Sequence, residues 1–391
     1  MKAGWTKTTL GAAFATATGN TPPKNNADFY GQFMPLVKPP ELCDAVLYSA
    51  EDGLSESGAR VARTLPPNSI LVSCIGNLGK IGLNTVPVAF NQQINAILPD
   101  VKKAVPEFMF YQVLSCSFKE QLEALASGTT VPIVNKSKFN SVEIVLPPLP
   151  EQQRIVTILD EAFDGIATAK ANAEKNLRNA RAIFESHLQS VFSQRGEGWV
   201  VKKVAEVAKH SLGKMLDKAK NKGELQPYLR NINIRWFVFD LSDLLQMPFL
   251  LQETAKYTAT KGDVLICEGG YPGRAAIWAE DYPIYFQKAL HRVRFHEPEH
   301  NKWFLYYLYA QDKNGELKKH FSGTGIQHFT GEVLARFEIP LPPLAELRHA
   351  VAKFEKLSTE TQHLESIYQQ KLATLDALKK SLLDQAFTGQ F

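Results

Sequence analysis

Two stretches of the chain carry apolar residues at intervals of three and four positions, separated by polar ones. Residues 151–193 contain no proline and one glycine, and residues 346–387 contain neither. This spacing places the apolar side chains on one stripe of an α-helix, as in a coiled coil, and about forty residues make a helix of roughly 60 Å. The predicted stripes comprise Ile155, Leu159, Ala162, Ile166, Ala169, Ala173, Leu177 and Ala180 in the first stretch, and Phe354, Leu357, Thr361, Leu364, Tyr368, Leu372, Leu375, Leu378 and Leu382 in the second.

The regions in front of these helices have a different pattern, because glycine and proline divide them into short apolar runs. "SILVSCIG" (69–76) and "DVLICEG" (263–269) predict strands. "EFMFYQVLSCSFKEQLEALA" (107–126) and "KWFLYYLYAQ" (302–311) predict helices that pack on a β-rich body. We therefore divide the chain into a domain at 1–148, a long helix at 149–195, a second domain at 196–343 and a second long helix at 344–391.

The second half of the chain repeats the first. "LPPLPEQQRIV" at 146–156 returns as "LPPLAELRHAV" at 341–351, an offset of 195 residues. A constant offset over a long segment indicates duplication of one structural unit. The prolines end the strand before each junction and permit a helix to begin abruptly. The same offset relates "SGTTVPIV" (127–134) to "SGTGIQHF" (322–329), and "SHLQSVF" (186–192) to "SLLDQAF" (381–387).

A long helix with a single apolar stripe is not stable alone in water. Because the two stripes are equivalent by duplication, an antiparallel pair related by a pseudo-twofold axis lets each cover the other. The alternatives are that each helix packs on its own domain, or that the helices form a homodimer. We favour the intramolecular pair, which predicts an α+β fold with two pseudo-twofold-related α/β domains separated by two long antiparallel coiled-coil helices.

Composition adds little that is specific. With 45% hydrophobic and 21% charged residues the chain is typical of globular proteins, and no apolar run reaches the length of a membrane span. The first residues lack the apolar core of a secretion signal. The cysteines show no CxxC pairing and fit free thiols in a reducing cytoplasm, where we expect the protein to be. They are Cys43, Cys74, Cys116 and Cys267.

The net charge of +4 does not by itself indicate a nucleic-acid binder. The most basic segment, residues 201–222, holds seven lysines against Glu206 and Asp217. Contact with phosphates is one interpretation of this run, and a solvated basic loop is the other.

Taken together, the duplicated architecture and its motifs resemble the DNA specificity subunit of type I restriction-modification enzymes. The resemblance covers essentially the whole chain and rests on the two "LPPL" junctions, the "SGTGIQHF" element and the opening "GW…LG". It implies two target-recognition domains that each read one half of a bipartite asymmetric sequence in double-stranded DNA, with helices that fix the unread spacer.

The resemblance also implies that this chain has no catalytic activity and binds no cofactor. Two methylation subunits that use S-adenosylmethionine would bind it, and a restriction subunit that uses ATP and Mg²⁺ to translocate DNA can join them. Candidates for partner docking are Glu151, Gln152, Gln153 and Glu346. The second junction departs from the first, since Leu347–Arg348 replaces Gln152–Gln153, so the two ends can hold a partner differently.

A search for catalytic motifs supports a non-enzymatic chain. No phosphate-binding loop is present, because in "IGNLGKIG" Cys74 takes the place of the first glycine and Ile81 follows the lysine. No "NPPY"-like methyltransferase loop occurs, which disfavours a solitary nuclease or methyltransferase. "HEPEH" (296–300) matches the zinc motif H-E-x-x-H, but Pro298 interrupts the helix that such a site needs.

Equivalent positions in the two copies suggest residues that contact DNA. Phosphates are bound by Lys and Arg, and base edges by Arg, Lys, Asn and Gln. Lys80 and Arg274 both follow a strand and a Gly-x-x-Gly turn, which can bring backbone close to phosphate. The other candidates are Asn91, Gln92, Gln93, Gln287 and Lys288 after a shared phenylalanine, Lys136, Lys138, Gln327 and His328 near the "SGT" motifs, Lys214, and, more weakly, Tyr30, Arg230, Asn231 and Asn233.

Each of these candidates has an alternative role as a surface polar residue or a turn-stabilising amide. The whole chain also has an alternative function in another class, a scaffold or adaptor whose duplicated domains bind proteins while the coiled coil sets their distance. Salt dependence separates the two, because a DNA-binding protein loses affinity steeply as salt rises.

Overall fold

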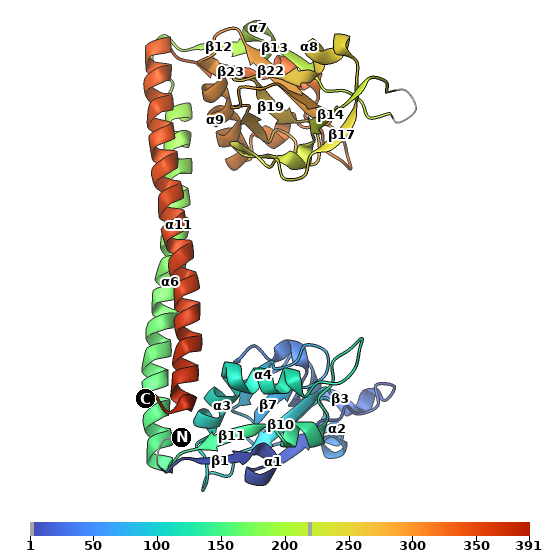
Figure 1. The fold of residues 1–391 in the computed structure, drawn as a ribbon, viewed down its shortest axis with the longest axis vertical. Helices are drawn as coiled ribbons and strands as arrows, with labels where there is room; N and C mark the ends of the chain where they lie inside the picture. Colours follow the sequence, from blue (N-terminus) through green and yellow to red (C-terminus); the bar gives the residue numbers. More distant parts are fainter. Residues whose placement is uncertain (1–3, 218–220) are drawn as a thin grey trace. The chain divides into compact units, whose positions relative to one another are not determined.

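The computed structural model describes residues 4–217 and 221–391 (Figure 1). The chain divides into two compact units, Met1–Glu174 with Gln370–Phe391, and Lys175–Gln369. Each unit contains one globular domain and segments of the two long helices, α6 (Leu149–Ser193) and α11 (Leu344–Thr388). Both helices are 45 residues long, so the two long helices that the sequence predicted are confirmed.

The first domain has three layers, in which helices cover one face of a five-stranded sheet and a four-stranded sheet covers the other. Strand β7 is buried on both faces, with Ile70 and Val72 against the helices and Leu71 against the second sheet. The strand orders are β2-β10-β7-β8-β4 and β5-β3-β9-β6. The strands are β2 (Ala15–Thr18), β3 (Tyr30–Val37), β4 (Ala45–Leu47), β5 (Gly53–Leu54), β6 (Thr64–Leu65), β7 (Ile70–Ser73), β8 (Ile81–Asn84), β9 (Val88–Phe90) and β10 (Ile94–Leu98), and the helices are α1 (Leu10–Ala13), α2 (Glu56–Val61), α3 (Pro106–Leu114), α4 (Cys116–Ala124) and α5 (Lys136–Asn140).

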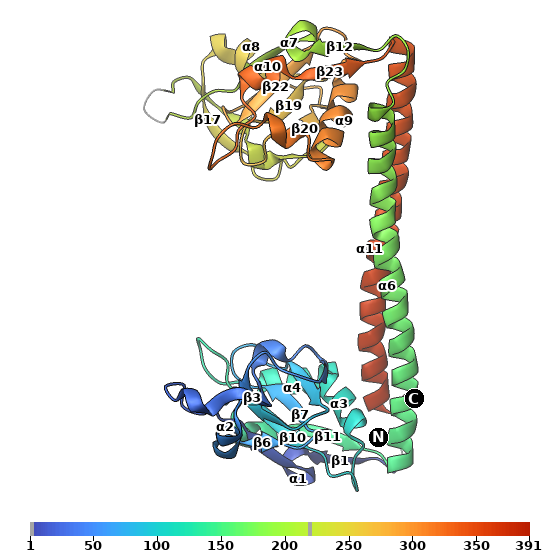
Figure 2. The same ribbon diagram turned by 180° about the vertical axis from the view of Figure 1, so that it is seen from behind.

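The second domain repeats these layers. Figure 2 shows strand β19 and the edge strand β20 beside α9, and β19 is again buried on both faces. The strand orders are β13-β22-β19-β20 and β17-β14-β21-β18, with a short β15-β16 hairpin. The strands are β13 (Ala208–Leu212), β14 (Glu224–Leu229), β15 (Ile234–Arg235), β16 (Val238–Phe239), β17 (Leu245–Phe249), β18 (Thr258–Ala259), β19 (Val264–Cys267), β20 (Ala275–Ile277), β21 (Ile284–Phe286) and β22 (Leu290–Phe295), and the helices are α7 (Val204–Val207), α8 (Thr254–Tyr257), α9 (His300–Lys313) and α10 (Gly331–Arg336).

Each domain is closed by a short antiparallel ladder that joins its first strand to its last. In the first domain β1 (Thr6–Thr9) pairs with β11 (Glu143–Leu146), so that Thr6 lies opposite Leu146. In the second, β12 (Val200–Lys203) pairs with β23 (Glu338–Leu341), so that Val200 lies opposite Leu341. A proline-containing junction then leads directly from β11 into α6 and from β23 into α11.

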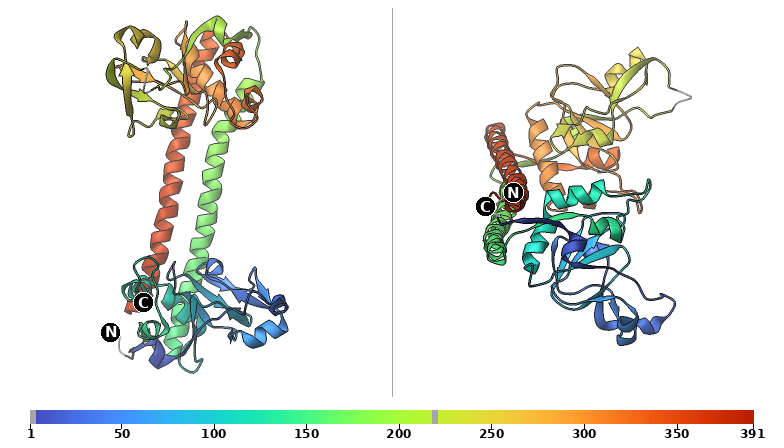
Figure 3. Two further views of the ribbon diagram at one scale, coloured as in Figure 1. Left: turned by 90° about the vertical axis from the view of Figure 1, so that its right-hand side faces the viewer. Right: turned by 60° about the horizontal axis from the view of Figure 1, so that its bottom comes forward.

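Within each unit the segments of α6 and α11 pack in opposite chain directions (Figure 3). In the unit of the first domain, Ile155 and Leu159 near the start of α6 share a core cluster with Leu383 and Ala386 near the end of α11. Lys170 and Asp376 form an ion pair of 2.6 Å further along. This is the predicted intramolecular antiparallel pair, and the helix ends also pack on the domain, since the rings of Phe108 and Phe387 lie 5.3 Å apart.

The unit of the second domain uses the other halves of the same helices. Phe192 of α6 lies 5.8 Å from Phe354 of α11, measured between ring centroids, and Arg181 pairs with Glu365 at 3.0 Å. The predicted stripe is wrong at Leu364 and Leu378, which are 38% and 45% exposed.

No helix in the described part of the chain is both long enough and apolar enough to cross a membrane. All four cysteines are free thiols, as predicted.

Candidate nucleic-acid interface

Both domains carry the same tight turn after a strand that is buried on both faces, β7 in the first domain and β19 in the second. Gly76 and Gly79 follow β7, and Gly270 and Gly273 follow β19, all with φ between +72° and +82°. Residues with a side chain rarely adopt this conformation, so the two glycine pairs hold the turn in shape. The N–H of Gly79 donates to the Ser73 oxygen at 3.0 Å, and Gly273 makes the matching bond in the second domain at 2.9 Å.

Lys80 and Arg274 occupy the same position at the end of these turns. The backbone oxygen of each accepts a hydrogen bond from the last residue of the preceding strand, at 2.9 Å from Ser73 and at 2.8 Å from Cys267. The equivalence of the two cations that the repeat predicted is therefore confirmed. The Lys80 ammonium, partly exposed, has no ion-pair partner among the described residues.

The Arg274 side chain, unlike that of Lys80, is held by contacts within its own domain. Its Nη2 donates to the Asn231 oxygen at 3.0 Å, and its guanidinium carbon lies 4.3 Å from the ring centre of Tyr271. It borders a hollow of about 480 Å³ that Arg235 also lines. Two guanidinium groups on one hollow suit an anion such as phosphate, or the acceptor edge of guanine. Tyr271 and Arg235 were not among the residues predicted from the sequence, where only the place of Tyr271 inside the Gly-x-x-Gly turn marked it.

A seven-residue loop lies beside each turn and corresponds to the two "SGT" motifs. Ser127 and Ile133 exchange two backbone hydrogen bonds, of 3.0 and 2.8 Å, and Ser322 and His328 do the same at 2.9 Å. The loops are tied to the turns by equivalent bonds, from Val134 to the Cys74 oxygen (2.8 Å) and from Phe329 to the Glu268 oxygen (2.7 Å).

A third segment, which follows β9 or β21, reaches the same place. The Gln93 oxygen accepts from the Cys74 N–H at 2.8 Å, and the Ala289 oxygen accepts from the Glu268 N–H at 2.9 Å. Turn, loop and third segment therefore converge in each domain, and we call this the convergent surface: residues 74–80, 91–93 and 127–134 in the first domain, and 268–274, 287–289 and 322–329 in the second.

Several predicted contact residues keep their side chains free. In the described part of the chain these side chains form no hydrogen bond or ion pair: Lys80, Lys136, Lys138, Gln287, Lys288, Gln327 and His328. Gln92 accepts a hydrogen bond from Thr21 at 3.0 Å and is otherwise exposed. Gln93 is partly buried and accepts from Asn91 at 3.0 Å. For these residues DNA contact stays a prediction.

The assignment of Lys214 to DNA is wrong, because the residue is buried. It is 6% exposed, and its Nζ donates to the Pro248 oxygen at 2.9 Å and to the Glu253 carboxylate at 2.5 Å. Burial raises the pKa of Glu253, but hydrogen bonds from Lys214 and the Leu250 N–H outweigh it, so the pKa lies below its usual range. This pair is internal structure.

Two further candidates have internal roles. Arg230 donates to both the backbone oxygen and the carboxylate of Asp243 at 2.7 Å. Asn91 is buried and its amide stabilises the turn that contains Gln93. The weaker candidates Tyr30, Asn231 and Asn233 likewise bond to backbone oxygens within their own domains.

The described lysines of the basic run 201–222 come from different elements. Lys202 and Lys203 lie on β12, Lys209 lies on β13, and Lys214, which follows β13, is buried. Lys218 and Lys220 lie outside the described residues.

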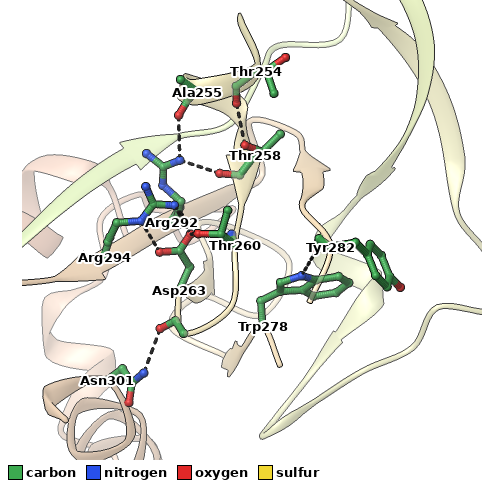
Figure 4. Close-up of polar contacts among 11 residues, drawn as sticks. Thr254, Ala255, Thr258, Thr260, Asp263, Trp278, Tyr282, Arg292, Arg294 and Asn301 are labelled. Carbon is green, nitrogen blue, oxygen red and sulfur yellow. Dashed lines mark hydrogen bonds and ion pairs between the residues drawn. The ribbon is translucent and has the colours of Figure 1, made fainter. Parts of the chain in front are cut away.

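Arginines of β22 are also used inside the second domain (Figure 4). Arg292 donates to the backbone oxygens of Thr258 (2.6 Å) and Ala255 (3.2 Å). Arg294 forms two bonds to the buried Asp263 carboxylate, of 2.7 and 2.6 Å. These contacts hold α8 and the start of β19 against β22, away from the turn at 268–274.

The zinc alternative finds no support. His296 precedes α9 and His300 begins it, so the two histidines do not share one helix face. In the residues that the structure describes, no group of three or more His, Cys, Asp or Glu side chains is placed to bind a metal ion.

The predicted docking residue Gln152 is an internal residue of the first domain. It is fully buried, its amide nitrogen donates to the oxygens of Lys103 (2.9 Å) and Pro147 (2.8 Å), and its Oε1 accepts from the Val105 N–H (2.9 Å). Its side chain is therefore not available to a partner. The equivalent Leu347 is buried in an apolar cluster of the second domain instead.

The other docking candidates remain at the surface or near it. Glu151 pairs with Arg154 at 2.7 Å, and Gln153 is exposed. Glu346 accepts a hydrogen bond from the Trp199 indole at 3.0 Å, and the neighbouring Arg348 pairs with Glu299 at 2.7 Å. The two junctions thus differ in structure as they do in sequence, and partner contact at these residues stays a prediction.

Comparisons with known proteins define the class. The family model for the type I restriction modification DNA specificity domain matches residues 2–177 and 196–375. The chain therefore belongs to this family and holds two copies of its domain. The resemblance inferred from the sequence is confirmed.

Named relatives agree. The chain is 25% identical over 334 residues to the MjaVIII specificity subunit of Methanocaldococcus jannaschii, a match that covers 80% of this chain and 75% of that one. It is 33% identical over 168 residues to the HindI specificity subunit of Haemophilus influenzae, which covers 41% of this chain and 36% of that one. The match thus spans about a third of the Haemophilus protein.

Two solved structures share the fold. One comes from work on complex assembly and conformational transition of the type I R-M system, with a TM-score of 0.82, 21% identity and coverage of 99% and 98%. The other is the HsdS subunit of Thermoanaerobacter tengcongensis, with a TM-score of 0.65, 20% identity and coverage of 100% and 98%. At this identity the likeness concerns the fold.

Proposed function

We propose that this chain is the non-catalytic DNA-reading subunit of a type I restriction-modification complex, and that each domain reads one half of a bipartite target. The observation that carries the proposal is the convergent surface, which recurs in both domains on the same hydrogen-bonded frame. The side chains on that frame differ, with Lys80 in one domain and Arg274 in the other. A shared frame with diverged side chains suits two half-sites of different sequence.

In this proposal the cations at the turns bind phosphates or base edges, and the loops and third segments carry the remaining base contacts. The helices α6 and α11 set the length of the spacer between the half-sites. Both helices are 45 residues long, which supports this role. Two helices of equal length that pack along each other would define a single distance between the half-sites.

The partners in this proposal are those expected for a specificity subunit of a type I restriction-modification enzyme. Two methylation subunits would dock near the junctions, where Glu151, Gln153 and Glu346 are the candidates. They would supply S-adenosylmethionine and the methyl transfer to adenine, and a restriction subunit would supply ATP and Mg²⁺. The names of the relatives, specificity subunits of type I restriction enzymes, support this assignment, and such a complex would meet DNA in the cytoplasm.

Methylome sequencing of cells with and without this chain tests the proposal. We expect a bipartite site, methylated on adenine, that disappears when the chain is absent. Binding of the purified chain or complex to a duplex with that site should weaken steeply as salt rises. A methylome that does not change, together with salt-insensitive binding to a protein partner, would support the scaffold alternative.

Arg274→Ala tests the convergent surface directly. Loss of one guanidinium contact should weaken binding to the target about tenfold or more. Lys261→Ala is the matched control, because Lys261 is an exposed cation of the same domain that pairs with Asp281 at 2.7 Å, ahead of β19. Equal affinities of the two variants, both folded by circular dichroism, would contradict the assignment of Arg274.

A further inference from the structure

The loops of the convergent surface carry an aliphatic residue at their tips. Ile326 in the second domain is 74% exposed, and Val131 in the first is 46% exposed. The two residues occupy equivalent positions, because in each loop the glycine three residues earlier packs against the backbone oxygen of the tip residue. A Cβ added to Gly323 would lie 2.4 Å from the Ile326 oxygen, and one added to Gly128 would lie 2.4 Å from the Val131 oxygen. Each glycine, with φ near +105°, lets the chain fold back beneath the tip residue.

These tips stand on a fixed base. The backbone bonds between Ser322 and His328 close the loop, and the bond from Phe329 to Glu268 ties it to the turn. An aliphatic side chain held in water on such a base loses the stabilisation that burial would give. The same arrangement in both domains, with Val in one and Ile in the other, indicates a surface that is buried by a ligand.

The neighbouring charges indicate which ligand. The loop in the second domain lies on Gly269, where an added Cβ would be 3.1 Å from the His328 ring, and Arg274 completes the adjoining turn. An apolar tip on a loop that is hydrogen-bonded to the turn ending at an arginine matches a duplex, which offers phosphates at the rim of a groove and apolar base surface within it. A protein partner would instead need an acidic group and an apolar patch opposite each of the two convergent surfaces.

We propose, on the basis of the proposed function, that Ile326 and Val131 make apolar contacts with bases inside the groove and so help determine sequence specificity. In either of two geometries, the aliphatic side chain makes an apolar contact with a base. The side chain packs on the methyl group of a thymine in the major groove, or it inserts between two base pairs and unstacks them.

The experiment uses the intact complex and a duplex that carries the site found by methylome sequencing. Ile326→Ser and Val131→Ser are compared with Leu251→Ser and Val101→Ser. The controls remove aliphatic side chains that are 92% and 69% exposed, Leu251 in the second domain and Val101 in the first, and neither belongs to the convergent surface. We expect the tip variants to bind about tenfold more weakly, with reduced preference for the target over a duplex with one altered base pair, while the controls bind like wild type.

Modified duplexes separate the two forms of contact. Replacing each thymine of the half-site by uracil removes one methyl group, and at the contacted position it should weaken wild-type binding without further effect on Ile326→Ser. With 2-aminopurine at each position, insertion should raise the fluorescence on binding of wild type but not of Ile326→Ser. Either result supports the proposal.

The proposal is overturned if wild type binds its target selectively while both tip variants match their controls in affinity and selectivity. If wild type shows no selective binding, the proposed function itself fails, and the two failures are thereby distinguished. Because both tips are exposed, the variants should keep the melting temperature of wild type, which checks that a loss of binding is not a loss of folding.

Discussion

Replacement of Gln152 by alanine should open the junction between the first domain and α6. The side chain is itself fully buried and serves three backbone groups, the oxygens of Lys103 and Pro147 and the N–H of Val105, of which the first and the last are partly accessible to water. Each group left unpaired costs about 1–3 kcal/mol, and a water molecule in the vacated space can recover part of this. We therefore expect a local destabilisation of about 3–5 kcal/mol.

Hydrogen exchange measured by mass spectrometry is the suitable assay, because it reports the stability of a segment rather than of the whole chain. Peptides that contain residues 103–105 and 147–156 should exchange faster by the corresponding factor. Gln153→Ala is the control, since that neighbour is exposed and its loss should change stability by less than about 0.5 kcal/mol.

Gln152→Leu is the sharper variant because it installs the residue of the second junction. It keeps most of the volume but still leaves the three backbone groups unpaired, so it should be destabilising although Leu347 is well packed in its own domain. We attribute Gln152 to the polar backbone groups around it, and Leu347 to the apolar packing around it. Hydrogen exchange as slow in Gln152→Leu as in wild type would refute this explanation.

Three further predictions concern the turns and buried groups. Gly273→Ala should destabilise the second domain more than Gly76→Ala does the first by urea denaturation, since both carry a backbone penalty of about 1–2 kcal/mol but only Gly273 has a neighbour, a Leu317 methyl, within 2.5 Å of the added Cβ. Burial raises the pKa of Cys267 to about 11, so at pH 8 it should resist iodoacetamide while the exposed Cys43 reacts. Burial lowers the pKa of His291 to about 4, so the folded state resists its protonation. As pH falls from about 6.5 to 4, tryptophan fluorescence should report a loss of up to about 3 kcal/mol in unfolding free energy, and His291→Gln should lose less.

The sequence predicted those features that depend on local pattern or on duplication. Proline-free runs at helical spacing gave both long helices, and the repeat aligned Lys80 with Arg274 because both follow the same pair of glycines. Such signals lie within a few residues of the feature they predict, or recur at a fixed offset, and so can be read without the fold.

The errors concern partners that are distant in the sequence. The sequence predicted Lys214 to be a surface cation, but in the fold it pairs with Glu253. It predicted Gln152 to be a docking residue, but its side chain bonds to the backbone of Lys103 and Val105. Whether a polar side chain faces solvent or a buried backbone group depends on tertiary contacts that neither spacing nor charge reveals. Arg235 was missed for the same reason.

The ladder that closes each domain has a consequence for inheritance. Because Thr6 lies opposite Leu146, and Val200 opposite Leu341, each domain begins and ends at neighbouring points. We expect that the segment between the two ends can be replaced as a unit while the ladder, the "LPPL" junction and the helices stay unchanged. If each domain reads one half-site, as proposed, one such exchange would change half of the target and leave the rest of the chain unaltered.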